Sequence, residues 1–198
     1  MRAGLMSPNA TLSTLWGAWL IVWMVGALWT ARTVEHQPVG PRLAHSALFA
    51  GGSLLIFFRP DALGPGIRVA SAAAWGGVVL VAVGLGFAVW ARVHLGRLWS
   101  GHVTLKADHA IIRSGPYGWV RHPIYTGLLL AATGTTIVGG TPGGLVGLGL
   151  LTCGVLLKIR QEEKLLGAHF GDAYRSYQTE VPALVPRFHG GPTGCLLV

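Results

Sequence analysis

The sequence has few charged residues and few cysteines. Only 11% of its 198 residues are Asp, Glu, Lys or Arg, whereas soluble domains carry about 25%. Its two cysteines, Cys153 and Cys195, are too few for a disulfide framework and lack the spacing of a zinc site. These shortages exclude a disulfide-stapled secreted mini-protein and an ordinary soluble enzyme. With 52% hydrophobic residues and a mean hydropathy of +0.54, the chain is predicted to be an integral membrane protein.

Several motifs of soluble enzymes are missing as well. No GxGxxG follows a strand, so a soluble dinucleotide-binding fold is not available. The eight histidines form no HExxH or other paired spacing, and we therefore predict no metal site. No GxSxG elbow supports a hydrolase triad. The net charge of +8 comes from cations placed between apolar runs, which favours orientation in a membrane over nucleic-acid binding.

Five apolar runs predict an all-α integral membrane protein with about five transmembrane helices. Three spans come first, at 12–31, 43–58 and 69–91, and a run of about 20 residues suffices to cross a ~30 Å hydrocarbon core. Two shorter runs, 124–138 and 145–157, flank a Gly- and Pro-rich cluster and predict a helical hairpin over 124–157. The many glycines of the hairpin indicate close helix packing.

Charge placement predicts the orientation and the division of the chain. Residues 92–121 hold five cations and one acid, so we expect this loop in the cytoplasm, with the N-terminus outside and the C-terminus inside. We divide the chain into N-terminal membrane helices (1–91), a C-terminal functional region (92–188) and a tail (189–198) that is disordered or not native.

Two polar blocks flank the hairpin, which should bring them together at one membrane face. In the first, Pro123 suits the first turn of a helix, and the helix N-terminus with Arg121 and His122 forms a site for a carboxylate or phosphate. The alternative is a juxtamembrane anchor, with Arg121 on lipid headgroups and the aromatic residues Tyr117 and Tyr125 in the interfacial belt.

The second block places charged residues just beyond the membrane. Lys158 and Glu162 are four residues apart and share a helix face, and Glu162 and Glu163 are adjacent in a chain with seven acids. Ionisable groups so close to a bilayer are functional candidates. The alternative is a surface ion pair, which would contribute under about 1 kcal/mol.

The two blocks together resemble the isoprenylcysteine carboxyl methyltransferase family. The resemblance rests on GPYGWVRHPIYTG at 115–127, the hairpin that follows, and EEKLLGAHFGDAYRSYQTEVPALVP at 162–186, and it covers about residues 94–188. The related membrane phospholipid N-methyltransferases share this pattern.

The resemblance implies an S-adenosylmethionine (SAM) site on the cytoplasmic side, with S-adenosylhomocysteine as product and no Rossmann fold. It implies that Glu162 meets the ammonium group of SAM. The charge of Arg121 would allow it to position an anionic acceptor or to neutralise a phosphate. Lys158 stands where prenylcysteine enzymes have an arginine for the substrate carboxylate, and it keeps the charge without the bidentate geometry. The implied cofactor contacts are Lys106, His109, Ala110, Ile111, Ile112, Tyr117, His122, Pro123, Ile124, Tyr125, Glu162 and Glu163.

Other functions remain open from the sequence. The methyl acceptor could be a prenylcysteine, phosphatidylethanolamine, another lipid or a small thiol. A membrane reductase resembling the steroid reductases would bind NADPH, with Lys106, Arg113 and Arg121 at its 2′-phosphate, although the two glutamates suit a cationic cofactor better. A non-enzymatic membrane scaffold would leave both polar blocks unexplained.

Overall fold

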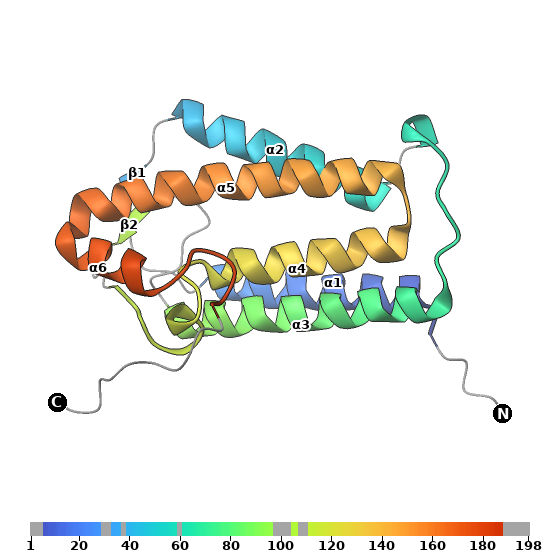
Figure 1. The fold of residues 1–198 in the computed structure, drawn as a ribbon, viewed down its shortest axis with the longest axis horizontal. Helices are drawn as coiled ribbons and strands as arrows, with labels where there is room; N and C mark the ends of the chain where they lie inside the picture. The colour runs from blue at the N-terminus through green and yellow to red at the C-terminus, as the bar shows by residue number, and fades with distance from the viewer. Residues whose placement is uncertain are drawn as a thin grey trace.

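The computed structural model describes residues 6–28, 33–36, 39–58, 61–96, 104–106 and 111–187. Five long helices run along a common direction (Figure 1). They are α1 (Pro8–Ala27), α2 (Val39–Phe58), α3 (Ser71–Leu95), α4 (Pro123–Gly139) and α5 (Pro142–Phe170). Among the described residues, α1, α3 and α5 are long and apolar enough to cross a membrane, and α2 and α4 carry shorter apolar stretches. The predicted helical membrane architecture is confirmed at this level.

The hairpin forms where the sequence predicts it, but its second arm is longer than predicted. Gly140 ends α4 in the left-handed conformation with φ +59°, and the Thr141 side chain accepts a hydrogen bond from the Gly144 amide at 3.1 Å as α5 begins. The apolar run 145–157 occupies only part of the 29-residue α5. Hydropathy falls at residue 158, where the polar block begins, but the residues that follow still favour a helix. The helix therefore continues through the polar block.

Glycines hold the helices together in two closely packed groups. A Cβ atom on Gly84 of α3 would lie 2.5 Å from the Gly127 carbonyl oxygen of α4, and one on Gly52 of α2 would lie 2.7 Å from the Gly147 carbonyl oxygen of α5. Such approach of two backbones requires residues without side chains. The predicted close packing of the hairpin glycines is confirmed for Gly147 and Gly154, whose partners lie on α2, but not for Gly149, which has nothing within 4 Å.

Helix α1 joins the α3–α4 group, and a cavity of about 580 Å³ lies between this group and the α2–α5 pair. Its walls are almost entirely apolar. The lining residues are Leu12, Ser13, Trp16, Gly17, Trp19 and Leu20 of α1; Phe49, Ser53, Ile56 and Phe57 of α2; Leu128 and Ala132 of α4; Leu151 and Val155 of α5.

The polar blocks meet at the opposite end of the bundle from the hairpin turn (Figure 1). The 3-10 turn η3 (Gly115–Gly118) and the short helix α6 (Asp172–Glu180), which follows α5, lie at this polar end, whereas the 3-10 turn η1 (Asp61–Leu63) connects α2 to α3 at the other end (Figure 1). Strand β1 (Thr33–His36) pairs antiparallel with β2 (Thr104–Lys106), a contact between distant loops that the sequence did not predict. After α6, residues 181–187 turn back over the start of α4, and we call them the C-terminal strap.

Candidate active site

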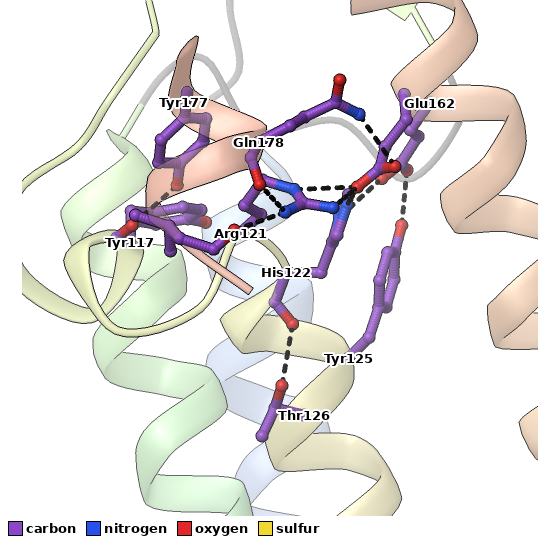
Figure 2. Close-up of polar contacts among 10 residues, drawn as sticks. Tyr117, Arg121, His122, Tyr125, Thr126, Glu162, Tyr177 and Gln178 are labelled. Atoms are coloured by element: carbon purple, nitrogen blue, oxygen red, sulfur yellow. Dashed lines mark hydrogen bonds and ion pairs between the residues drawn. The ribbon is translucent and has the colours of Figure 1, made fainter. Parts of the chain in front are cut away.

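A histidine between two carboxylates lies at the centre of the polar end (Figure 2). His122 directly precedes α4, and its Nδ1 is 3.4 Å from Glu162 Oε2 while its Nε2 is 3.1 Å from Glu163 Oε1. Burial alone would lower the pKa of His122, but the two carboxylates raise it above its usual value. The imidazolium form donates from both ring nitrogens and so matches both acids.

Arg121 is tied to α5 and to the segment that follows α6. Its Nε and Nη2 donate to Glu163 Oε1 at 2.9 and 2.6 Å, and its Nη1 donates to the carbonyl oxygens of Gln178, at 3.2 Å, and Val181. Four of the five guanidinium donors are therefore used within the chain. The Gln178 amide also donates to Glu163 Oε2 at 3.1 Å.

The C-terminal strap covers the start of α4 through backbone contacts. The amides of Arg121 and His122 donate to the carbonyl oxygens of Pro182 and Ala183 at 2.8 and 3.0 Å. The Thr126 hydroxyl donates to Leu184 O at 2.8 Å. Since Pro123 has no N–H, the first-turn donors left for a ligand are the amides that follow it.

Tyr125 joins the acid side of the site to the apolar side. Its hydroxyl donates to Glu162 Oε1 at 2.5 Å. One ring face stacks with His122 at 5.8 Å between centroids, and Lys158 Nζ lies 5.5 Å from the ring centroid. Lys158 is itself only 9% exposed, so its ammonium group is held beside Glu162 and Tyr125 with little access to water.

Residues at helical spacing on α5 connect this site to the cavity. Leu151 and Val155 line the cavity, and Lys158 and Glu162 follow at intervals of three and four residues. These spacings place all four on one helix face. Along this face the chain passes from apolar wall to buried cation to carboxylate.

Two buried tyrosines brace the site from the side of η3. Tyr177 of α6 donates its hydroxyl to the Tyr117 carbonyl oxygen at 2.7 Å. Burial raises the pKa of Tyr117, with Glu162 adding to the effect, and burial raises that of Tyr177 to about 12. Both phenols stay neutral at physiological pH and act as hydrogen-bond donors.

The comparisons with known proteins agree with this arrangement. Residues 77–168 match the model of the isoprenylcysteine carboxyl methyltransferase (ICMT) family. The matched segment is similar to this family and makes up just under half of the chain. The match runs from α3 to near the end of α5, so it includes the His122 centre but leaves out α1, α2, α6 and the C-terminal strap.

Curated relatives fall into two groups. The chain is 34% identical over 99 residues to the protein-S-isoprenylcysteine O-methyltransferase of Schizosaccharomyces pombe, covering 48% of this chain and 42% of that protein. It is 42% identical over 71 residues to the methanethiol S-methyltransferase of Pseudomonas sp. (strain GM41(2012)), covering 36% of this chain and 26% of that protein. The matches thus span less than half the length of these relatives.

A solved membrane structure shares the fold. The eukaryotic intramembrane Ras methyltransferase ICMT superposes with a TM-score of 0.51 at 23% identity, covering 76% of this chain and 54% of that chain. At 23% identity, this similarity shows only that the two folds are alike. It supports an integral membrane protein of ICMT architecture.

The structure gathers most of the site residues expected from the ICMT resemblance. The group within the polar end comprises Tyr117, Arg121, His122, Pro123, Ile124, Tyr125, Lys158, Glu162 and Glu163, and Ile112 packs beside it. Ile111 is half-buried next to Ile112. Lys106 belongs to β2, while its side chain, His109, Ala110 and the 189–198 tail lie outside the described residues.

Sequence reasoning missed three contributors to the site. Thr126 lies inside the recognised 115–127 motif, so its contact with the C-terminal strap could have been sought there. Gln178 and Tyr177 lie inside the 162–186 motif, but the motif does not show their roles, because these depend on how α6 folds back onto Arg121 and Tyr117.

Proposed function

We propose that the chain is a SAM-dependent membrane methyltransferase that methylates the carboxylate of a single-tailed lipophilic acceptor, an S-isoprenylcysteine. The face of α5 carries this proposal. Val155 lines an apolar cavity, Lys158 is a buried cation one turn further on, and Glu162 is an acid one turn beyond that. An apolar tail, a carboxylate and the ammonium group of SAM would match these positions in turn.

The residues at the acid end fit SAM. Glu162 accepts from Tyr125 and faces His122, and a carboxylate has room for a further donor such as the ammonium group of the cofactor. The first-turn amides of Ile124 and Tyr125 suit its carboxylate because the strap uses those of Arg121 and His122. When bound, SAM supplies a methyl group on a positively charged sulfur.

The residues of this chain would act by positioning and charge. In the transfer, a bond forms between the acceptor oxygen and the methyl carbon as the carbon–sulfur bond breaks, and a carboxylate nucleophile needs no general base. Lys158 would hold that carboxylate in line, and burial beneath the strap would exclude water. Arg121 would act as a positioning residue for the strap, since Glu163 and two carbonyl groups already hold its guanidinium.

The size of the cavity favours one tail over two. Its volume of about 580 Å³ lies within the range of about 300–1,000 Å³ typical of single small-molecule sites. Leu128 lines the cavity and, like Tyr125, packs against the cluster of Ala91, Tyr117 and Ile124, so the cavity lies next to the polar site. A tail bound there would have its reacting end near Lys158, and the cavity size favours an S-isoprenylcysteine over a diacyl phospholipid.

We further propose five membrane spans, with the N-terminus outside and the C-terminus and SAM site in the cytoplasm. The short apolar stretches of α2 and α4 run beside the three long helices over most of their length (Figure 1). On this proposal residues 1–91 supply the first three spans, and 92–188 supply the catalytic region.

The test combines binding with turnover on detergent-purified protein. Calorimetric titration with SAM, S-adenosylhomocysteine and NADPH should give binding of the adenosyl compounds alone, and labelled SAM should methylate N-acetyl-S-farnesylcysteine. Lys158→Met should raise KM for the acceptor at least about tenfold, since it removes a buried charge partner, while Lys158→Arg should retain activity. The exposed Lys164, on the same helix, provides the matched control Lys164→Met. Binding of NADPH alone would overturn the proposal in favour of a reductase.

A second candidate is S-methylation of a small thiol. The matches to methanethiol S-methyltransferases favour it, and so does Lys158, which lacks the bidentate geometry of the arginine expected for a prenylcysteine carboxylate. Methanethiol would make no use of the cavity. Methylation of methanethiol, with the prenylated acceptor left untouched, would establish this alternative.

A further inference from the structure

Three tryptophans on α1 form a ladder from the polar site down into the cavity. Trp23 packs against the cluster of Ala91, Tyr117 and Ile124, against which Tyr125 also packs. Trp19 stacks on Trp23 at 4.6 Å between ring centroids, and Trp16 meets Trp19 edge-on at 5.6 Å. Trp16 and Trp19 both line the cavity, so this part of the ladder forms part of its wall.

Trp16 is held from two other helices as well. Its Nε1 donates to Thr135 Oγ1 of α4 at 3.0 Å, and its ring meets the Phe57 ring of α2 edge-on at 5.3 Å. Thr135 is 1% exposed and donates its own hydroxyl to Ala131 O at 2.8 Å, which fixes the acceptor oxygen. A side chain of α1 that contacts both α4 and α2 crosses the space between the two helix groups.

This crossing lies at a defined depth. Tyr125, which borders the reacting end, and Thr135, which holds Trp16, are both on α4. Ten residues separate them, about 15 Å at 1.5 Å per residue. Leu128 and Ala132 line the cavity above this level, while Leu12 and Ser13 line it one turn beyond Trp16 on α1. A tail longer than about 15 Å must therefore pass or displace the indole.

We infer that Trp16, braced by Thr135 and Phe57, sets the length of apolar tail that the acceptor can carry. The inference rests on the proposed function and adds a specificity-determining residue to it. It concerns α1 and α2, which lie outside the residues that match the ICMT family model. The occupant is the acceptor's tail, because the cavity is lined by apolar side chains and its wall residue Val155 lies one turn before the buried Lys158 on the same face of α5.

The experiment compares N-acetyl-S-geranyl-, S-farnesyl- and S-geranylgeranylcysteine as acceptors for the purified protein. We expect the two shorter tails to be methylated with higher kcat/KM than the geranylgeranyl tail. Trp16→Ala should raise the geranylgeranyl-to-farnesyl ratio of kcat/KM about tenfold, the range that pocket contacts with a few methylene groups produce. Thr135→Val, which removes the acceptor of the indole N–H, should shift the ratio in the same direction. Phe58→Ala, next to Phe57 but 78% exposed and outside the cavity lining, is the matched control and should leave the ratio unchanged.

Thermal stabilisation of the SAM-free protein by the same three compounds gives a readout that does not depend on turnover. Wild-type protein should be stabilised more by the farnesyl than by the geranylgeranyl compound, and Trp16→Ala should reverse this order. If the wild-type protein methylates none of the prenylated acceptors but is still stabilised more by the farnesyl than by the geranylgeranyl compound, the proposed reaction is refuted, whereas the limit on tail length is supported. Equal ratios in wild type, Trp16→Ala and Phe58→Ala, by both turnover and stabilisation, would overturn the inference.

Discussion

The contact between Arg121 and Glu163 gives the most direct test of how the polar end is held. Replacing Arg121 by Met removes its four hydrogen bonds to Glu163, Gln178 and Val181 while keeping much of its apolar stem. If Arg121 fixes the C-terminal strap, the change should destabilise the fold and release the strap. If it instead contacts the acceptor, stability should be unaffected and turnover should fall.

The magnitude follows from burial and from what Glu163 retains. The two side chains are 10% and 20% exposed, and loss of one partner of a buried ion pair costs about 3–5 kcal/mol. Glu163 keeps its contacts with His122 and Gln178, so we expect the lower end, about 3 kcal/mol. At about 2–4 °C per kcal/mol for a chain of this size, Tm should fall by about 6–12 °C.

The assay is thermal unfolding followed by tryptophan fluorescence, combined with hydrogen exchange over residues 181–187. Arg121→Met, Glu163→Gln and the double variant form a cycle, and the pair should show a coupling energy of about 1–2 kcal/mol. The strap amides should exchange faster in Arg121→Met. Arg175→Met is the control, because Arg175 is 76% exposed and pairs with an exposed Asp172, so Tm should not change.

Unchanged Tm and strap exchange in Arg121→Met, together with reduced turnover, would refute this reasoning. That result would restore the role that the sequence suggested for Arg121, which is to position an anionic acceptor. Strict additivity in the cycle would likewise show that the observed contact contributes nothing to stability.

Three further predictions concern packing, pH and the cofactor. Gly84→Ala should lower stability by about 1–3 kcal/mol because its Cβ would lie 2.5 Å from the Gly127 carbonyl oxygen, whereas Gly86→Ala, with nothing within 4 Å, should keep or raise Tm. The carboxylates raise the pKa of His122, so protonated His122 stabilises the fold fully below about pH 6.5, and this stabilisation is lost as the pH rises through the raised pKa. His122→Asn should flatten that part of a plot of Tm against pH. A variant curve parallel to that of the wild type would show that His122 does not cause this pH dependence. Glu162→Gln should lower SAM affinity in calorimetry while the protein stays folded, and wild-type affinity would remove Glu162 from the site.

The sequence alone determined which segments form the long apolar helices and which polar blocks meet at one end of them. Hydropathy predicted all five long helices, because each apolar segment must satisfy its own backbone hydrogen bonds in lipid whatever its neighbours are. The Gly- and Pro-rich cluster at 139–144 predicted the hairpin turn. The two motifs predicted the polar end, because Pro123 suits the start of a helix and the hairpin brings Glu162 back to that helix start. The boundaries of α5 were wrong because hydropathy marks the membrane and not the end of a helix.

Only the tertiary structure decided which groups face one another. His122 and Arg121 meet Glu163 across 41 and 42 residues of sequence, and Arg121 meets Val181 across 60. No local pattern encodes such distances, because side-chain pairing depends on how helices cross and on how a strap without regular structure lies over them. The same holds for the cavity and for Trp16 within it. Periodicity predicts that a tryptophan lies in a helix, but only packing of α1 against α4 and α2 places its indole across a path that a lipid tail would follow.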